Sequence, residues 1–181
     1  MGDTVIGPYK RDRIALCSAD GSPKTQRKTP CEAGYFFPGA AWVGTMRNAA
    51  ERLACTFVIF AGPYGLVGPL EVIAPYDVPG HSKEEQTMIK EKLSLTIPRL
   101  IGGNRYDLVV FYAGANPRAI IIEMMGPILK DNNMDLITFG KPNMWDIGKL
   151  EEFVQLLISG TTLNGLRAIL SFPERLDFFP K

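Results

Sequence analysis

The chain has 181 residues and a formal net charge of +1, with 46% hydrophobic and 22% charged residues. These values predict one folded domain with a substantial core, and they exclude a disordered chain and a surface that attracts polyanions by its overall charge. Three cysteines without a C-x-x-C pair and a single histidine, His81, argue against a disulfide framework, a zinc site and Ser–His or Cys–His catalysis. We expect no metal and no cofactor.

The first half of the chain alternates strand and helix patterns. Residues 13–19 (RIALCSA) form a short apolar run before the turn-forming DGSPK, which predicts a first strand. Residues 39–54 carry apolar side chains at three- and four-residue spacing, as in an amphipathic helix. Residues 56–61 (TFVIFA) are apolar throughout, which favours a strand covered on both faces. A long loop rich in glycine and proline, residues 62–80, follows this strand.

A capping-box pattern, S-x-x-E, marks the start of the next helix at Ser82 and Glu85. Its apolar face extends to Leu100, and Pro98 is expected to kink or split the helix because proline lacks a backbone donor. Residues 107–114 (DLVVFYAG) are again apolar and predict a third strand.

The C-terminal part continues the same alternation. Asn116 is expected to cap a helix that Pro117 opens. Residues 135–139 (DLITF) predict a fourth strand, and Asp146 is expected to cap the helix that follows. A short last helix is expected over residues 161–170, before a phenylalanine-rich tail.

Strands that alternate with helices and are apolar on both faces indicate an α/β fold. We predict a three-layer, open, mostly parallel sheet of about four to five strands with helices on both faces. A single domain is expected over residues 1–181, with its core at about 13–158 and with residues 159–181 packed on it.

No stretch approaches the ~20 apolar residues that cross a bilayer. The N-terminus lacks the apolar core of a signal peptide. We therefore expect a cytoplasmic protein without a membrane partner, and the sequence leaves its oligomeric state open.

Ligands bind beyond the carboxyl ends of the strands in such sheets. The predicted loops at those ends are residues 18–28, 62–80 and 114–117. In the longest of them, glycine and proline can fix the conformation, Tyr64 and Tyr76 offer aromatic faces for a nucleobase, and Asp77 offers a carboxylate. Tyr76 and Asp77 are the candidate catalytic residues. The alternative is a structural Ω-loop in which the tyrosines pack on the core and Asp77 caps a turn.

The other two loops offer weaker candidates. In CSADGSPKTQRK, Ser18 and Lys24 could hold a phosphate and Cys17 could contact a ligand. The alternative is a solvated loop with Cys17 as a small buried hydrophobe. In YAGANPR, Gly114 and Asn116 lie over a helix N-terminus, which favours anions, and plain helix capping is the alternative.

Residues 60–77, FAGPYGLVGPLEVIAPYD, resemble a pattern of the YaaA-type peroxide-stress proteins. There a strand runs into Tyr-Gly-Leu/Val, then a Pro, then a Pro-Tyr pair. A closer resemblance is to a family of small domains of unknown function with the same loop, and a related domain occurs in archaeal tRNA-modifying proteins of the archaeosine pathway. Gly65 and Pro75 match this loop and are candidate ligand-binding residues with Tyr64.

Four shorter motifs support the resemblance. Members of the small-domain family have a strand ending in Cys-Gly/Ser followed by Lys, a Pro-Ala/Cys pair and a Tyr ahead of a helix, a strand ending in Ala-Gly, and an Ile-Gly-Lys at a helix start. The matching residues are Cys17-Ser18, Lys24, Pro30-Cys31, Tyr35, Ala113-Gly114 and Ile147-Gly148-Lys149. The family usually has Ser-Ala-Lys-Tyr/His-Gly where this chain has AGPYG. Lys149 joins the candidate ligand-binding residues on this resemblance.

The resemblance implies a nucleotide, DNA or RNA as ligand. It favours a metal-independent N-glycosidase or base-exchange enzyme in which Asp77 acts on water or the sugar, Tyr64 and Tyr76 hold the base, and Ser18 and Lys24 hold phosphate. One alternative is a non-catalytic nucleic-acid-binding module of stress response or RNA modification that uses the basic run KTQRK. Another is a scaffold in which the glycine- and proline-rich loop is structural.

Overall fold

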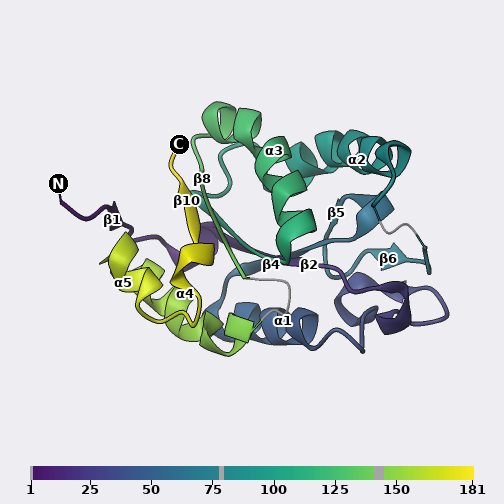
Figure 1. The fold of residues 1–181 in the computed structure, drawn as a ribbon, viewed down its shortest axis with the longest axis horizontal. Coiled ribbons are helices and arrows are strands. Elements are labelled where there is room, and N and C mark those ends of the chain that lie inside the picture. The colour runs from purple at the N-terminus through teal and green to yellow at the C-terminus, as the bar shows by residue number, and fades with distance from the viewer. Residues whose placement is uncertain (1, 78–79, 141–144) are drawn as a thin grey trace.

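The computed structural model describes residues 2–77, 80–140 and 145–181. Its centre is a six-stranded mixed sheet with the strand order β10-β8-β7-β2-β4-β5 (Figure 1). Four central strands run parallel to one another: β2 (Ile14–Ala19), β4 (Thr56–Phe60), β7 (Leu108–Tyr112) and β8 (Asp135–Phe139). The two edge strands pair antiparallel: β5 (Leu66–Val67) with β4, and β10 (Asp177–Phe179) with β8. The α/β class is as predicted, but the predicted number of strands is too low.

Helices cover both faces of this sheet (Figure 1). One face carries α1 (Ala41–Leu53), α4 (Leu150–Ser159) and α5 (Leu163–Arg167), and the other carries α2 (Lys83–Ile101) and α3 (Ala115–Asn132). Successive strand residues alternate between the two cores: Leu16 packs with the α1 side, whereas Ala15 and Cys17 pack with the α2 side. The central strands are apolar throughout because both of their faces are covered.

Two small antiparallel pairs lie outside the main sheet. β1 (Val5–Ile6) pairs with β9 (Thr161–Thr162), and β3 (Cys31–Glu32) pairs with β6 (Val72–Ile73). The second pair joins the segment that follows β2 to the glycine- and proline-rich loop that follows β4. In Figure 1 this segment, in purple, lies beside β6.

The helix starts differ in part from the predictions. The Ser82 hydroxyl accepts the Glu85 amide at 3.1 Å, so the predicted cap of α2 is confirmed. Of the two expectations for Pro98, a split does not occur, because α2 continues to Ile101 and the proline lies in its last turns. The predicted cap at Asn116 is also wrong. Gly114 is the N-cap of α3.

Asp146 does not cap a helix as predicted. It is buried, and its Oδ1 accepts the backbone amide of Ser171 at 2.7 Å, so it fixes the start of the tail. A 3₁₀ helix at Trp145–Lys149 precedes α4 instead. Within the described residues, none of the helices is long and apolar enough to cross a membrane.

Candidate functional site

The carboxyl ends of β2 and β4 carry the two segments that form the candidate site. Between them lies a hollow of about 380 Å³, which we call the basic groove. It is lined by Pro23, Lys24, Gln26, Arg27, Lys28, Pro75, Tyr76 and Asp77. Four of the predicted site residues therefore meet in one place: Lys24, Pro75, Tyr76 and Asp77.

The two walls of the groove come from different loops and are joined by a hydrogen bond. A 3₁₀ turn at Pro23–Thr25 forms the first wall, and the Thr25 hydroxyl closes this turn by donating to the Ser22 carbonyl at 2.7 Å. The second wall is the segment from Pro75 to Asp77, which has no regular secondary structure. The side chain of Gln26 joins the walls, because its Oε1 accepts the Tyr76 backbone amide at 3.1 Å.

The groove carries more positive than negative charge. Lys24, Arg27 and Lys28 are exposed, and the exposed Asp77 lines the same hollow. In the part of the chain that the structure describes, none of these three cations forms an ion pair. Ammonium and guanidinium groups that are not paired with a carboxylate are available to an anion.

Behind the groove, the Tyr76 hydroxyl donates a hydrogen bond to the carboxylate of Asp20. Asp20 is the first residue after β2 and is half-buried. Burial raises the pKa of Asp20 to about 7, although the hydrogen bond from Tyr76 opposes the rise. Burial and the nearby Asp20 carboxylate raise the pKa of Tyr76. Tyr76 therefore keeps its proton, whereas Asp20 exchanges one near neutral pH.

The ring of Tyr76 belongs to an aromatic cluster. It lies nearly parallel to Phe36 with ring centroids 6.5 Å apart, and it meets Phe37 and Tyr64 edge-on at 6.5 and 5.8 Å. The Tyr64 hydroxyl accepts the Ala74 backbone amide at 3.0 Å. Tyr64 does not line the groove and instead holds the loop together, whereas Tyr76 contributes both to this cluster and to the groove.

Gly65 has a backbone role rather than a place in the groove. It is buried, its φ is +71°, and an added Cβ would lie 2.4 Å from the Thr96 hydroxyl of α2. That same hydroxyl accepts the Leu66 backbone amide at 2.9 Å. The glycine thus lets β5 turn back against α2.

The remaining predicted residues also lie outside the groove. Cys17 is buried in the core under α2 and α3, where burial raises the pKa of its thiol. Ser18 is fully buried, and its hydroxyl donates to the Ala19 carbonyl at 2.8 Å. Asn116 is exposed in the first turn of α3, and Lys149 is exposed at the start of α4. Gly114 is the cap of α3, as described above.

Asp20 was not predicted as a site residue. One signal in the sequence could have indicated it: a carboxylate directly after a fully apolar strand stands at the edge where ligands bind in α/β sheets. Its partner Tyr76 is 56 residues away, so only the fold reveals the contact. Among the described residues, no group of three or more His, Cys, Asp or Glu is placed to hold a metal ion.

The model of a family of unknown function, DUF6884, matches residues 14–142. The chain belongs to this family. The DUF6884 span contains β2, β4, β7 and β8 and both walls of the basic groove. Searches of curated proteins and of solved structures find no match.

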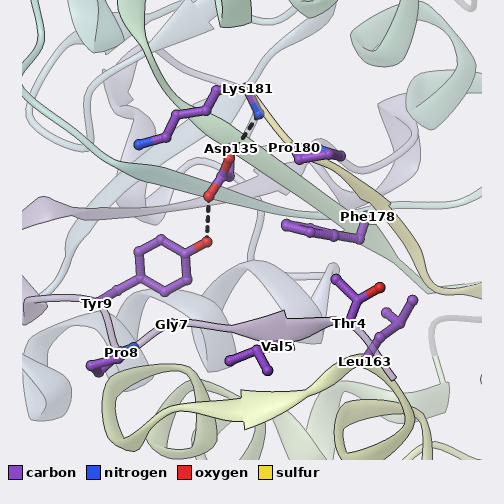
Figure 2. A pocket seen from close by; sticks show the side chains of 10 residues that line it. All are labelled: Thr4, Val5, Gly7, Pro8, Tyr9, Asp135, Leu163, Phe178, Pro180 and Lys181. Atoms are coloured by element: carbon purple, nitrogen blue, oxygen red, sulfur yellow. Dashed lines mark hydrogen bonds between the residues drawn. The ribbon is translucent and has the colours of Figure 1, made fainter. Parts of the chain in front are cut away.

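A larger hollow of about 570 Å³ lies at the amino end of β8 (Figure 2). In it, the Tyr9 hydroxyl donates to one oxygen of Asp135 at 2.5 Å, and the Lys181 backbone amide donates to the other at 2.8 Å. Both carboxylate oxygens are thus already engaged by the chain itself. Most of the lining residues lie outside the DUF6884 span, and the hollow is at the opposite end of the strands from the basic groove. We therefore take the basic groove as the candidate site.

Proposed function

We propose that the basic groove binds the phosphate of a nucleotide or of nucleic acid. The observation that carries this proposal is the set of three cations, Lys24, Arg27 and Lys28, which line one hollow without an ion pair among the described residues. Arginine and lysine are the side chains that most often bind phosphate. The volume of about 380 Å³ is within the ~300–1,000 Å³ that small-ligand sites span.

The resemblance of the loop from Tyr64 to Asp77 to the YaaA-type proteins and to a domain of archaeosine-pathway enzymes supports the same class of ligand. In this proposal the protein works in the cytoplasm on a nucleotide, DNA or RNA. Without catalysis, it would be a nucleic-acid-binding module of stress response or RNA modification.

The double variant Lys24→Ala, Lys28→Ala tests the proposal. Its affinity for a labelled oligonucleotide is expected to be about 10- to 100-fold weaker at low salt, because two charge-assisted phosphate contacts are lost. The plot of log affinity against log salt concentration should also become less steep, by about 0.7 for each lost contact with a single strand. Fluorescence anisotropy over a salt series measures both quantities.

The matched control is Lys10→Ala, Lys130→Ala, which removes the same charge. Both of these lysines are exposed near the amino edge of the parallel strands, away from the groove. The control should bind nearly as tightly as the unchanged protein. Equal loss in both double variants would show that binding follows overall charge, and the proposal would then fail.

A second candidate, N-glycosidase activity, is favoured by the position of Asp77. Its carboxylate lines the groove that would hold the phosphate, with Tyr76 beside it. A carboxylate there can take a proton from water while the water oxygen bonds to the sugar C1′. The C1′–N bond breaks, and the base leaves with its electron pair and takes up a proton.

Asp77→Asn tests this chemistry. Asp77 is exposed, so the variant should keep its melting temperature within a few degrees while it loses release of free base. Chromatography of products from nucleotides, DNA and RNA measures the release. Equal base release by both proteins would exclude Asp77 as the catalytic group, and no release by either would leave a binding module.

A further inference from the structure

A second hollow of about 220 Å³ lies next to the basic groove, and Arg27 lines both hollows. Two hydrogen bonds hold Arg27 against the neighbouring segment. Its backbone amide donates to the Phe36 carbonyl at 2.8 Å, and its Nε donates to the Tyr35 carbonyl at 2.8 Å. The position of Arg27 relative to Tyr35 is therefore fixed by the fold.

Tyr35 forms an exposed aromatic platform in this second hollow. Its side chain is 52% exposed, unlike Tyr64 and Tyr76, which are half-buried. The Arg47 guanidinium carbon lies 4.3 Å from the centre of the Tyr35 ring, and Arg47 also donates to the Gly34 carbonyl. A ring backed in this way by a cation is held in place before a ligand arrives.

Tyr35 and Arg47 also line a third hollow of about 220 Å³, together with Leu70, which is 75% exposed. The three hollows thus share residues in series: Arg27 joins the first to the second, and Tyr35 and Arg47 join the second to the third. We call this set the basic-aromatic track. It consists of Lys24, Arg27, Lys28, Tyr35 and Arg47.

We infer that the track binds a single-stranded nucleic acid, with phosphates at the basic groove and an unpaired base stacked on Tyr35. The inference rests on the proposed function of the groove and names its substrate class. A base face is free to stack on an aromatic side chain only when the strand is unpaired, because a duplex buries its base faces between neighbouring pairs.

Charge and extent favour a nucleic acid strand over other ligands. Arg47, like the groove cations, forms no ion pair within residues 2–77, 80–140 and 145–181. Among the described residues, Glu51 is the one carboxylate that lines the second or third hollow. A mononucleotide would occupy the basic groove and leave the rest of the track empty. A strand with a repeating phosphate backbone complements cations that continue from one hollow to the next.

Tyr35→Ala and Tyr35→Phe test the inference. Labelled oligothymidylate and oligouridylate of about eight nucleotides, a duplex of the same length and a nucleoside monophosphate are the probes. Tyr35→Ala should weaken single-strand binding about 5- to 30-fold and leave monophosphate binding unchanged. Tyr35→Phe should bind like the unchanged protein, because stacking uses the ring and not the hydroxyl. Comparing the two oligonucleotides shows whether DNA or RNA is preferred.

Leu95→Ala is the matched control, since Leu95 is 69% exposed on α2, on the other side of the sheet. It should leave all affinities unchanged.

Two outcomes would contradict the inference and leave the proposed function standing. In the first, the monophosphate binds and the single strand binds no more tightly than the monophosphate. In the second, Tyr35→Ala binds the single strand as tightly as the unchanged protein does. The same holds if the duplex binds as tightly as the single strand. Normal strand binding by Tyr35→Ala would point to a protein partner for the exposed Tyr35 and Leu70. If no probe binds, the proposed function fails as well.

Discussion

Replacing Gly65 by alanine is expected to lower the free energy of unfolding by about 3–5 kcal/mol. The φ of Gly65 is +71° and its ψ is −134°, a conformation that residues with a Cβ rarely adopt. The added Cβ would also lie 2.4 Å from the Thr96 hydroxyl, which must then move. Because that hydroxyl accepts the Leu66 amide, the clash also breaks a buried hydrogen bond between β5 and α2.

Urea unfolding of Gly65→Ala measures this loss, and Gly126→Ala is its control. Gly126 lies within α3, and an added Cβ there meets nothing within 4 Å. Alanine should therefore raise the free energy of unfolding by about 0.5–1 kcal/mol at this site. An unchanged unfolding midpoint for Gly65→Ala would mean that the turn does not depend on the glycine conformation.

Asp20→Asn is expected to stabilise the protein above neutral pH by about 2–4 kcal/mol. Burial raises the pKa of Asp20 from 3.8 in the unfolded chain to about 7 in the folded protein. The folded state thus binds the proton more tightly. The stability that this carboxyl contributes is fully present below pH 4 and is lost as the pH rises through 7. Asparagine stays neutral and can still accept the Tyr76 hydrogen bond, so it avoids this loss.

Unfolding free energies measured between pH 4 and pH 9 test the effect. The unchanged protein should lose stability across this window relative to Asp20→Asn, and the two should converge near pH 4. Tyr76→Phe should move the loss to higher pH, since the hydrogen bond from Tyr76 lowers the pKa of Asp20. Parallel profiles for Asp20→Asn and the unchanged protein would contradict the assignment.

The sequence predicted the four central strands because short runs that are apolar throughout are typical of strands covered on both faces. The predicted bounds of β8 equal the observed ones, and those of β2 and β4 differ by one residue at one end. The edge strands were missed for a physical reason. Leu66–Val67 and Asp177–Phe179 are two and three residues long, and they become strands only through pairing with β4 and β8.

Local patterns also limited what could be predicted of the site. Lys24, Tyr76 and Asp77 were predicted as site residues because loops after parallel strands collect ligand-binding groups, and the structure places the three in one groove. The neighbouring sequence could not reveal that Tyr76 reaches Asp20 or that Arg27 reaches Tyr35. These contacts depend on how two distant loops pack together.

The Tyr76–Asp20 contact joins the groove to a half-buried proton-exchanging group. An anion bound in the basic groove next to Tyr76 would favour the uncharged form of the Asp20 carboxyl. If the groove binds an anion as proposed, we expect capture near neutral pH to take up a proton from the buffer and a more alkaline solution to weaken the complex. The groove would then couple its occupancy to the acidity of its surroundings without a histidine.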